Sequence, residues 1–65
     1  MDKTIYIMHE DTELECVVEY VEYLEDGTNV QEVTAVFLPD GVQHLEKKTL
    51  GDLKVKACDE FHASH

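Results

Sequence analysis

Carboxylates dominate residues 10–32, which contain nine of them and neither lysine nor arginine. They are Glu10, Asp11, Glu13, Glu15, Glu19, Glu22, Glu25, Asp26 and Glu32. Valine, tyrosine and leucine residues are interleaved with these acids, which predicts an ordered element with a surface of one sign rather than a disordered acidic tail. A surface of this kind attracts basic groups on a partner.

A second set of residues has the chemistry of metal ligands, or of a nucleophile and its base. Cys58 and His62 are four residues apart, a spacing that places them on one side of a helix, and Cys16, His9 and His44 are further donors. The chain has no Cys-x-x-Cys pair, and a lone cysteine in an apolar pattern more often packs in a core. A chain of 65 residues also has little room for a cavity that excludes water. We therefore expect no metal site, no cofactor and no catalytic activity.

The charge is unevenly distributed along the chain. Residues 1–46 contain twelve acids and one lysine, a net charge of −11, whereas residues 47–65 contain three acids and four lysines, a net charge of +1. Direct binding to nucleic acid or to an anionic membrane depends on lysine and arginine, and the chain has no arginine. The expected partner is a protein with a basic surface, and direct nucleic-acid and membrane binding are not expected.

The length predicts one domain, residues 1–65, with a thin core and frayed residues 63–65. A chain of this size buries only about 60% of the surface that its unfolded form exposes. A free energy of unfolding of roughly 3–5 kcal/mol is typical of such domains. The sequence shows neither a signal-peptide pattern nor an apolar run of about 20 residues. We expect a cytoplasmic protein with reduced thiols.

Two structures compete for residues 14–24, the segment that contains most of the acids. Leucine, cysteine, valine and tyrosine at even positions 14, 16, 18 and 20 indicate a half-buried strand. Leu14, Val17, Val21 and Leu24 also fit helical spacing, with Gly27 as a helix end. We predict a strand, because five of the seven residues 17–23 are valine or tyrosine and a turn follows at residues 26–29.

The remaining elements complete an α+β fold. Residues 3–8 and 30–38 are predicted strands, and a turn at residues 39–41 precedes a short edge strand at 42–45. Residues 49–62 are predicted as a helix capped by Thr49, although residues 53–57 also alternate like an edge strand. The fold class is an antiparallel meander of three or four strands with one C-terminal helix packed on one face, the face that carries Leu14, Cys16, Val18 and Tyr20.

This order of elements resembles that of small, uncharacterised phage-type acidic reading frames. The resemblance covers roughly residues 12–62 and includes the run Val36-Phe37-Leu38-Pro39-Asp40-Gly41-Val42 followed by a short helix. It implies the fold and no particular chemistry. The lysine-rich last element departs from the acidic helix expected of that group.

A strand at residues 14–24 makes a geometric prediction about the acids. Glu13, Glu15, Glu19 and Glu25 share one face with Val17, Val21 and Tyr23, while Glu22 points to the core side or its margin. Alternate strand residues lie roughly 6.6–6.8 Å apart, and this density of charge is comparable with that of one phosphate strand of DNA, at about 3.4 Å per charge along the axis. The predicted partner-binding residues are Glu13, Glu15, Val17, Glu19, Val21, Glu22, Tyr23 and Glu25.

Three functions fit this face. It is expected to bind a basic surface of a host protein, as a nucleic-acid mimic or as an inhibitor of a nucleic-acid-handling or defence protein. The alternative is a structural or assembly subunit that forms a homodimer or larger homo-oligomer through Val17, Val21 and Tyr23 or through a strand edge. The simplest reading is an acidic exterior that only keeps a small protein in solution.

Overall fold

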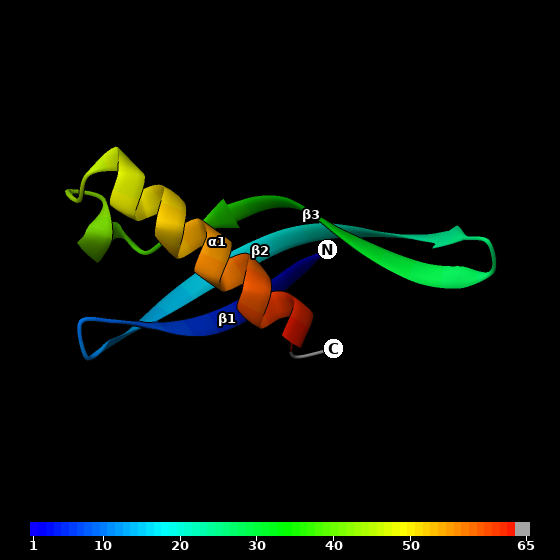
Figure 1. Ribbon diagram of the computed structural model, residues 1–65, viewed down its shortest axis with the longest axis horizontal. Helices are drawn as coiled ribbons and strands as arrows, with labels where there is room; N and C mark the ends of the chain where they lie inside the picture. Colours follow the sequence, from blue (N-terminus) through cyan, green and yellow to red (C-terminus); the bar gives the residue numbers. More distant parts are fainter. Residues whose placement is uncertain (64–65) are drawn as a thin grey trace.

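The computed structural model describes residues 1–63, which form a three-stranded antiparallel sheet with one α-helix across one of its faces (Figure 1). The strands are β1 (Asp2–His9), β2 (Thr12–Glu25) and β3 (Thr28–Phe37), in the spatial order β1-β2-β3. A 3₁₀ helix, η1 (Asp40–Val42), leads to the helix α1 (Lys47–Ala63). The predicted α+β meander with a C-terminal helix is confirmed, and residues 14–24 are a strand.

Two-residue turns join the strands and set their register. The β1–β2 turn is Glu10-Asp11, with φ values of 48° and 63°, and the β2–β3 turn is Asp26-Gly27, with φ values of 51° and 78°. Positive φ at both central residues gives a turn whose twist matches that of paired strands. Turns this short fix the pairing register, so β2 cannot shift by one residue relative to its neighbours.

The core lies between α1 and the sheet face that carries the even residues of β2. Leu14, Cys16 and Val18 are buried there, and the ring centroid of Tyr20 lies 4.9 Å from that of Phe61 on α1. Buried side chains from the other elements complete the core: Ile5, Ile7, Val42, Leu53 and Ala57. Helix α1 therefore packs on the predicted face of β2 through its buried residues Leu53, Ala57 and Phe61.

A β-bulge in β3 explains an irregular pattern in its sequence. Ala35 pairs with Glu19 and Val33 pairs with Tyr20, so Thr34 is an extra residue without a partner position in β2. The bulge lets Val33 and Val36, three residues apart, both pack against the core. A regular strand would have placed them on opposite faces.

The predicted edge strand at residues 42–45 is wrong. These residues belong to η1 and the turn after it, where the amides of Val42, Gln43 and Leu45 each donate to a carbonyl three residues earlier. Local bonds of this kind satisfy the backbone without a neighbouring strand.

The predicted start of the helix is also corrected. Helix α1 begins at Lys47 rather than Thr49, and the Leu50 amide donates to the Glu46 carbonyl at 2.9 Å, so Thr49 lies inside the first turn. Fraying was predicted for residues 63–65; Ala63 is the last residue of α1, and residues 64 and 65 lie outside the described residues.

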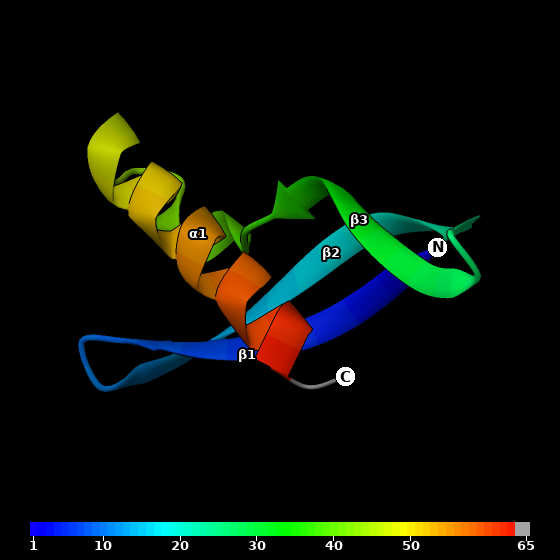
Figure 2. The same cartoon turned by 45° about the vertical axis from the view of Figure 1, so that its right-hand side comes forward.

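The two hairpins extend in opposite directions along a molecule of 42 × 19 × 17 Å (Figure 1). Strand pairing between β1 and β2 ends at Asp2 and Glu19, and Met1 exchanges two further bonds with the backbone of Tyr20. Residues 21–32 therefore continue as a two-stranded ribbon, here called the β2–β3 arm. Figure 2 shows this arm beyond the end of α1. Within residues 1–63, no helix is long and apolar enough to cross a membrane.

Candidate functional site

The sheet face turned away from α1, here called the outer face, carries the odd residues of β2. Strand register places Thr4, Val17 and Phe37 in one row across the three strands. Tyr6 pairs with Glu15, and Met8 pairs with Glu13. The outer face therefore combines acids of β2 with apolar side chains from all three strands.

Large apolar side chains on this face are open to solvent. Tyr6, Met8 and Phe37 expose 54%, 49% and 52% of their surface. Sequence reasoning did not include them among the binding residues. The alternation of Tyr6 and Met8 with the buried Ile5 and Ile7 was the available signal, but their place beside Glu13 and Glu15 depends on the register of the turns.

The β2–β3 arm carries the other half of the predicted binding residues. Val21 and Tyr23 are 45% and 43% exposed, and Glu25 ends the strand at the turn. Glu22 has the opposite parity, on the side of the sheet that α1 covers elsewhere, and its Oε2 accepts a hydrogen bond from Gln31 Nε2 at 3.3 Å. The structure thus places seven of the eight predicted residues on one face and Glu22 on the other.

The charges on the outer face form two groups rather than a continuous row. Glu13 and Glu15 lie toward the β1–β2 turn, Val17 interrupts the row, and Glu19 follows opposite Asp2. Four of the five lysines lie on α1, across the sheet from this face. An even row of phosphate-like charges is therefore not present, whereas an apolar centre with acidic margins is.

One of these lysines contacts the sheet. Lys56 Nζ donates a hydrogen bond of 2.6 Å to the Met8 carbonyl of the edge strand β1. A lysine at an edge discourages pairing with another chain. The free edge of β3 is therefore the more open edge for strand pairing.

The cysteines and histidines of residues 1–63 do not form a joint cluster. Cys16 is fully buried, and burial raises the pKa of its thiol. Cys58 is half-buried on α1, and the rings of the exposed His62 and of Phe61 are T-shaped, with 5.4 Å between their centroids. Among residues 1–63, no three histidine, cysteine, aspartate or glutamate side chains are placed to hold a metal ion.

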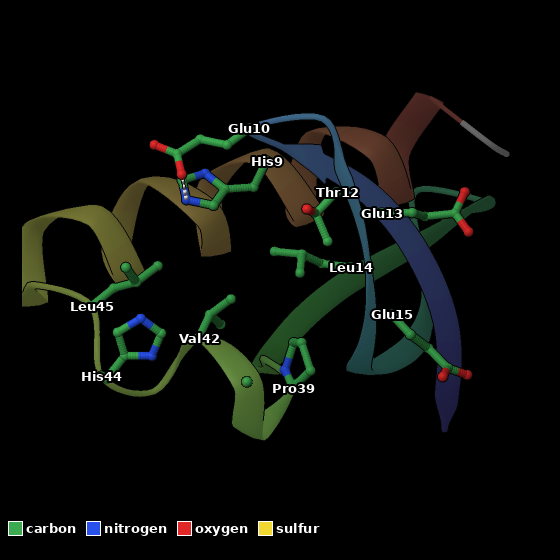
Figure 3. Close-up of a pocket in the computed structure, with 11 residues that line it drawn as sticks. His9, Glu10, Thr12, Glu13, Leu14, Glu15, Pro39, Val42, His44 and Leu45 are labelled. Carbon is green, nitrogen blue, oxygen red and sulfur yellow. Dashed lines mark ion pairs between the residues drawn. The ribbon is translucent and has the colours of Figure 1, made fainter.

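A pocket of ≈ 360 Å³ lies at the end of the sheet, between the β1–β2 turn and residues 39–45. Both His9 and His44 line it, residues that the sequence offered only as further donors to a set with Cys58 and His62. Figure 3 shows Leu14 and Val42 pointing into the space between the two segments, with the Glu10 carboxylate beside the His9 ring. Sequence reasoning missed this pocket because residues 42–45 were predicted to extend the sheet.

The comparisons with known proteins add no family to this description. No family model, curated protein or solved structure matches the chain.

Proposed function

We propose that this chain is a small, non-enzymatic protein that binds a basic surface of another protein through its outer face. The observation that supports this is the composition of the face, in which Tyr6, Val17 and Phe37 are flanked by Glu13 and Glu15 and by Glu19. Interfaces between proteins commonly have an apolar, aromatic centre and a polar margin. A chain with a net charge of −10 selects a basic partner.

Proteins that handle nucleic acid are the natural class of partner, because they carry grooves lined with lysine and arginine. Occupation of such a groove would block the nucleic acid, which is the action of a mimic or an inhibitor. A host defence protein or another nucleic-acid-handling protein fits this description. The interrupted charge row favours recognition of a basic protein surface that also offers apolar contacts over imitation of phosphate spacing alone.

The test is capture from a bacterial lysate on the immobilised chain, at low and then at high salt, with the eluted proteins identified. We expect one or a few basic, nucleic-acid-binding proteins that elute as salt rises, because opposite charges at an exposed interface are screened within about 10 Å at 0.1 M salt. A purified candidate should then lose its nucleic acid when the chain is added.

A matched pair of variants separates the outer face from net charge. The triple change Glu13→Gln, Glu15→Gln and Glu19→Gln should slow association and flatten its salt dependence. The control Asp52→Asn, Asp59→Asn and Glu60→Gln removes the same charge from α1 and should retain the partner. Equal loss in both variants, or an eluate without a specific protein, contradicts the proposal.

The second candidate function is self-assembly, as a structural subunit. It is favoured by the exposure of Tyr6, Met8 and Phe37 on one face and by the free edge of β3. A homo-oligomer made this way would depend on apolar contact, so its mass by light scattering should not change with salt. Phe37→Ser would dissociate it, whereas a monomeric mass at all concentrations and salts excludes this candidate.

A further inference from the structure

The pocket at the end of the sheet has a different character from the flat outer face. Its floor is formed by Leu14, Val42 and Leu45, which come from β2 and from the segment before α1. Leu14 and Val42 remain 6% and 7% exposed, so the core reaches solvent at this point. The volume of ≈ 360 Å³ is at the lower end of the about 300–1,000 Å³ of ligand pockets, which suits one long side chain.

The rim of the pocket supplies one carboxylate and two flat rings. Glu10 Oε2 lies 3.9 Å from His9 Nε2, and the Glu10 side chain is 86% exposed, so it remains available to a ligand at the mouth. His44 lies on the opposite side of the pocket, on the segment after η1 (Figure 3). Glu13 and Glu15 also line the pocket through their strand, but their carboxylates point away from Val42 and His44 (Figure 3).

The charge of this region determines which ligand fits. Of the described residues, no lysine lines the pocket, while the flanking turn and loop carry Glu10, Asp11 and Asp40. A negatively charged ligand is therefore disfavoured, and a long aliphatic group that ends in a cation is complementary to both floor and rim.

We propose that this pocket binds an arginine side chain of a partner protein. The methylene stem packs on Leu14, Val42 and Leu45, and the guanidinium donates hydrogen bonds to the Glu10 carboxylate beside the His9 and His44 rings. Arginine suits the site better than lysine, because its planar guanidinium pairs with a carboxylate through two bonds and stacks on flat rings. Since the arginine would belong to the basic partner proposed above, this role of the pocket rests on that proposed function.

The test is a titration of the isotope-labelled full chain with the capped tripeptide acetyl-Ala-Arg-Ala-amide, followed by NMR. We expect saturable shifts centred on the methyl groups of Leu14, Val42 and Leu45. The same peptide with citrulline, a neutral group of nearly the same shape, should bind about two- to fivefold more weakly, because the charged bond to the exposed Glu10 is lost. The peptide with norleucine should bind no better than the citrulline peptide.

Two variants at the turn provide the matched comparison. Glu10→Gln should weaken binding of the arginine peptide by about two- to fivefold, the range of an exposed ion pair. It should leave binding of the citrulline peptide unchanged. Asp11→Asn removes the same charge from the neighbouring residue, outside the pocket lining, and should leave both unchanged. Unfolding midpoints in urea verify that both variants fold.

Three results overturn the proposal: shifts spread evenly over the acids of the outer face, equal binding of the arginine and norleucine peptides, or no saturable binding. The peptide titration needs no protein partner, so it fails or succeeds independently of the capture experiment. Loss of partner capture in the outer-face variant concerns only the proposed function. Absence of arginine binding at the pocket concerns only this inference.

Discussion

Thr34 Oγ1 donates a hydrogen bond to the Glu19 carbonyl oxygen across β2 and β3, at 3.2 Å. The bond lies at the β-bulge, where Thr34 has no partner position in β2. One side chain thus satisfies a carbonyl at the place where the ladder is disrupted. The bond also marks the point beyond which β1 no longer pairs and the β2–β3 arm begins.

Thr34→Val should destabilise the fold, because it removes this hydroxyl while keeping the shape of the side chain. We expect the free energy of unfolding to fall by about 0.5–1 kcal/mol, the range of a net hydrogen bond at a partly exposed site. Urea titration followed by circular dichroism measures the change. Thr34→Ser should retain most of the stability, and Thr28→Val, on the same strand but away from the bulge, should have little effect. Equal effects at the two threonines would contradict the assigned bond.

The bulge is also a feature of this fold that the sequence does not predict. The alternation in β2 predicted its buried face, since Leu14, Cys16 and Val18 are buried as expected. The spacing of Val33 and Val36 does not match the period of a regular strand, because it arises from an inserted residue whose position depends on the neighbouring strand. Residues 42–45 were mistaken for a strand because a run with one buried valine has no periodicity to separate the two structures.

The glycines at positions 51 and 27 should respond in opposite directions to alanine. Gly51 lies within α1, and a Cβ there would contact nothing within 4 Å, so Gly51→Ala should stabilise the fold by about 0.5–1 kcal/mol. Gly27 has a φ of +78°, which alanine adopts only with strain, so Gly27→Ala should destabilise it by about 1 kcal/mol. Thermal unfolding of both variants measures the difference. A loss of stability in Gly51→Ala would contradict the helical backbone and the open space described at residue 51.

The two phenylalanines provide a second matched pair. Phe61 is fully buried against Tyr20, whereas Phe37 is 52% exposed on the outer face. Phe61→Leu should lower the free energy of unfolding by about 1–2 kcal/mol, a large part of the roughly 3–5 kcal/mol expected of so small a domain. Phe37→Leu should change it by less than about 0.5 kcal/mol. Urea midpoints decide, and similar losses in both variants would mean that the outer face is covered in solution.

Only part of the candidate site could be predicted from the sequence. The acids of β2 and their common face followed from alternation alone. The neighbours Tyr6, Met8 and Phe37 did not, because cross-strand pairs are set by turn length, which composition does not determine. The pocket needed still more, since it joins residues 9–15 to a loop that follows all three strands.

Stability should fall at alkaline pH because of Cys16. Burial raises the pKa of this thiol above its ordinary value of 9.0, so the unfolded chain loses the proton before the folded chain does. The folded state binds more protons in this range, and the contribution is therefore complete below pH 9 and declines as the pH rises through the folded pKa. Unfolding midpoints between pH 7 and pH 10.5 measure this slope.

Cys16→Ala is the control for this slope. It should be less stable at pH 7, because it leaves a small cavity, but should lose less stability between pH 9 and pH 10.5 than the natural chain. The half-buried Cys58 should react with a thiol reagent in the native state, while Cys16 reacts only after unfolding. An unchanged alkaline slope in Cys16→Ala would show that Cys16 is not its source.

Asp2 and Glu19 are directly opposite each other on β1 and β2, and two carboxylates in that position repel. Glu19→Gln should therefore raise the free energy of unfolding by about 0.2–0.5 kcal/mol at low salt, even though Glu19 belongs to the face proposed to bind a partner. The gain should shrink at 0.5 M salt, because added ions screen the repulsion in the natural chain. Glu32→Gln, on the arm and opposite Val21, removes the same charge without a facing acid and should gain less. Urea titrations at both salt concentrations decide, and a loss of stability in Glu19→Gln would mean that Glu19 stabilises the sheet instead of being retained there for binding.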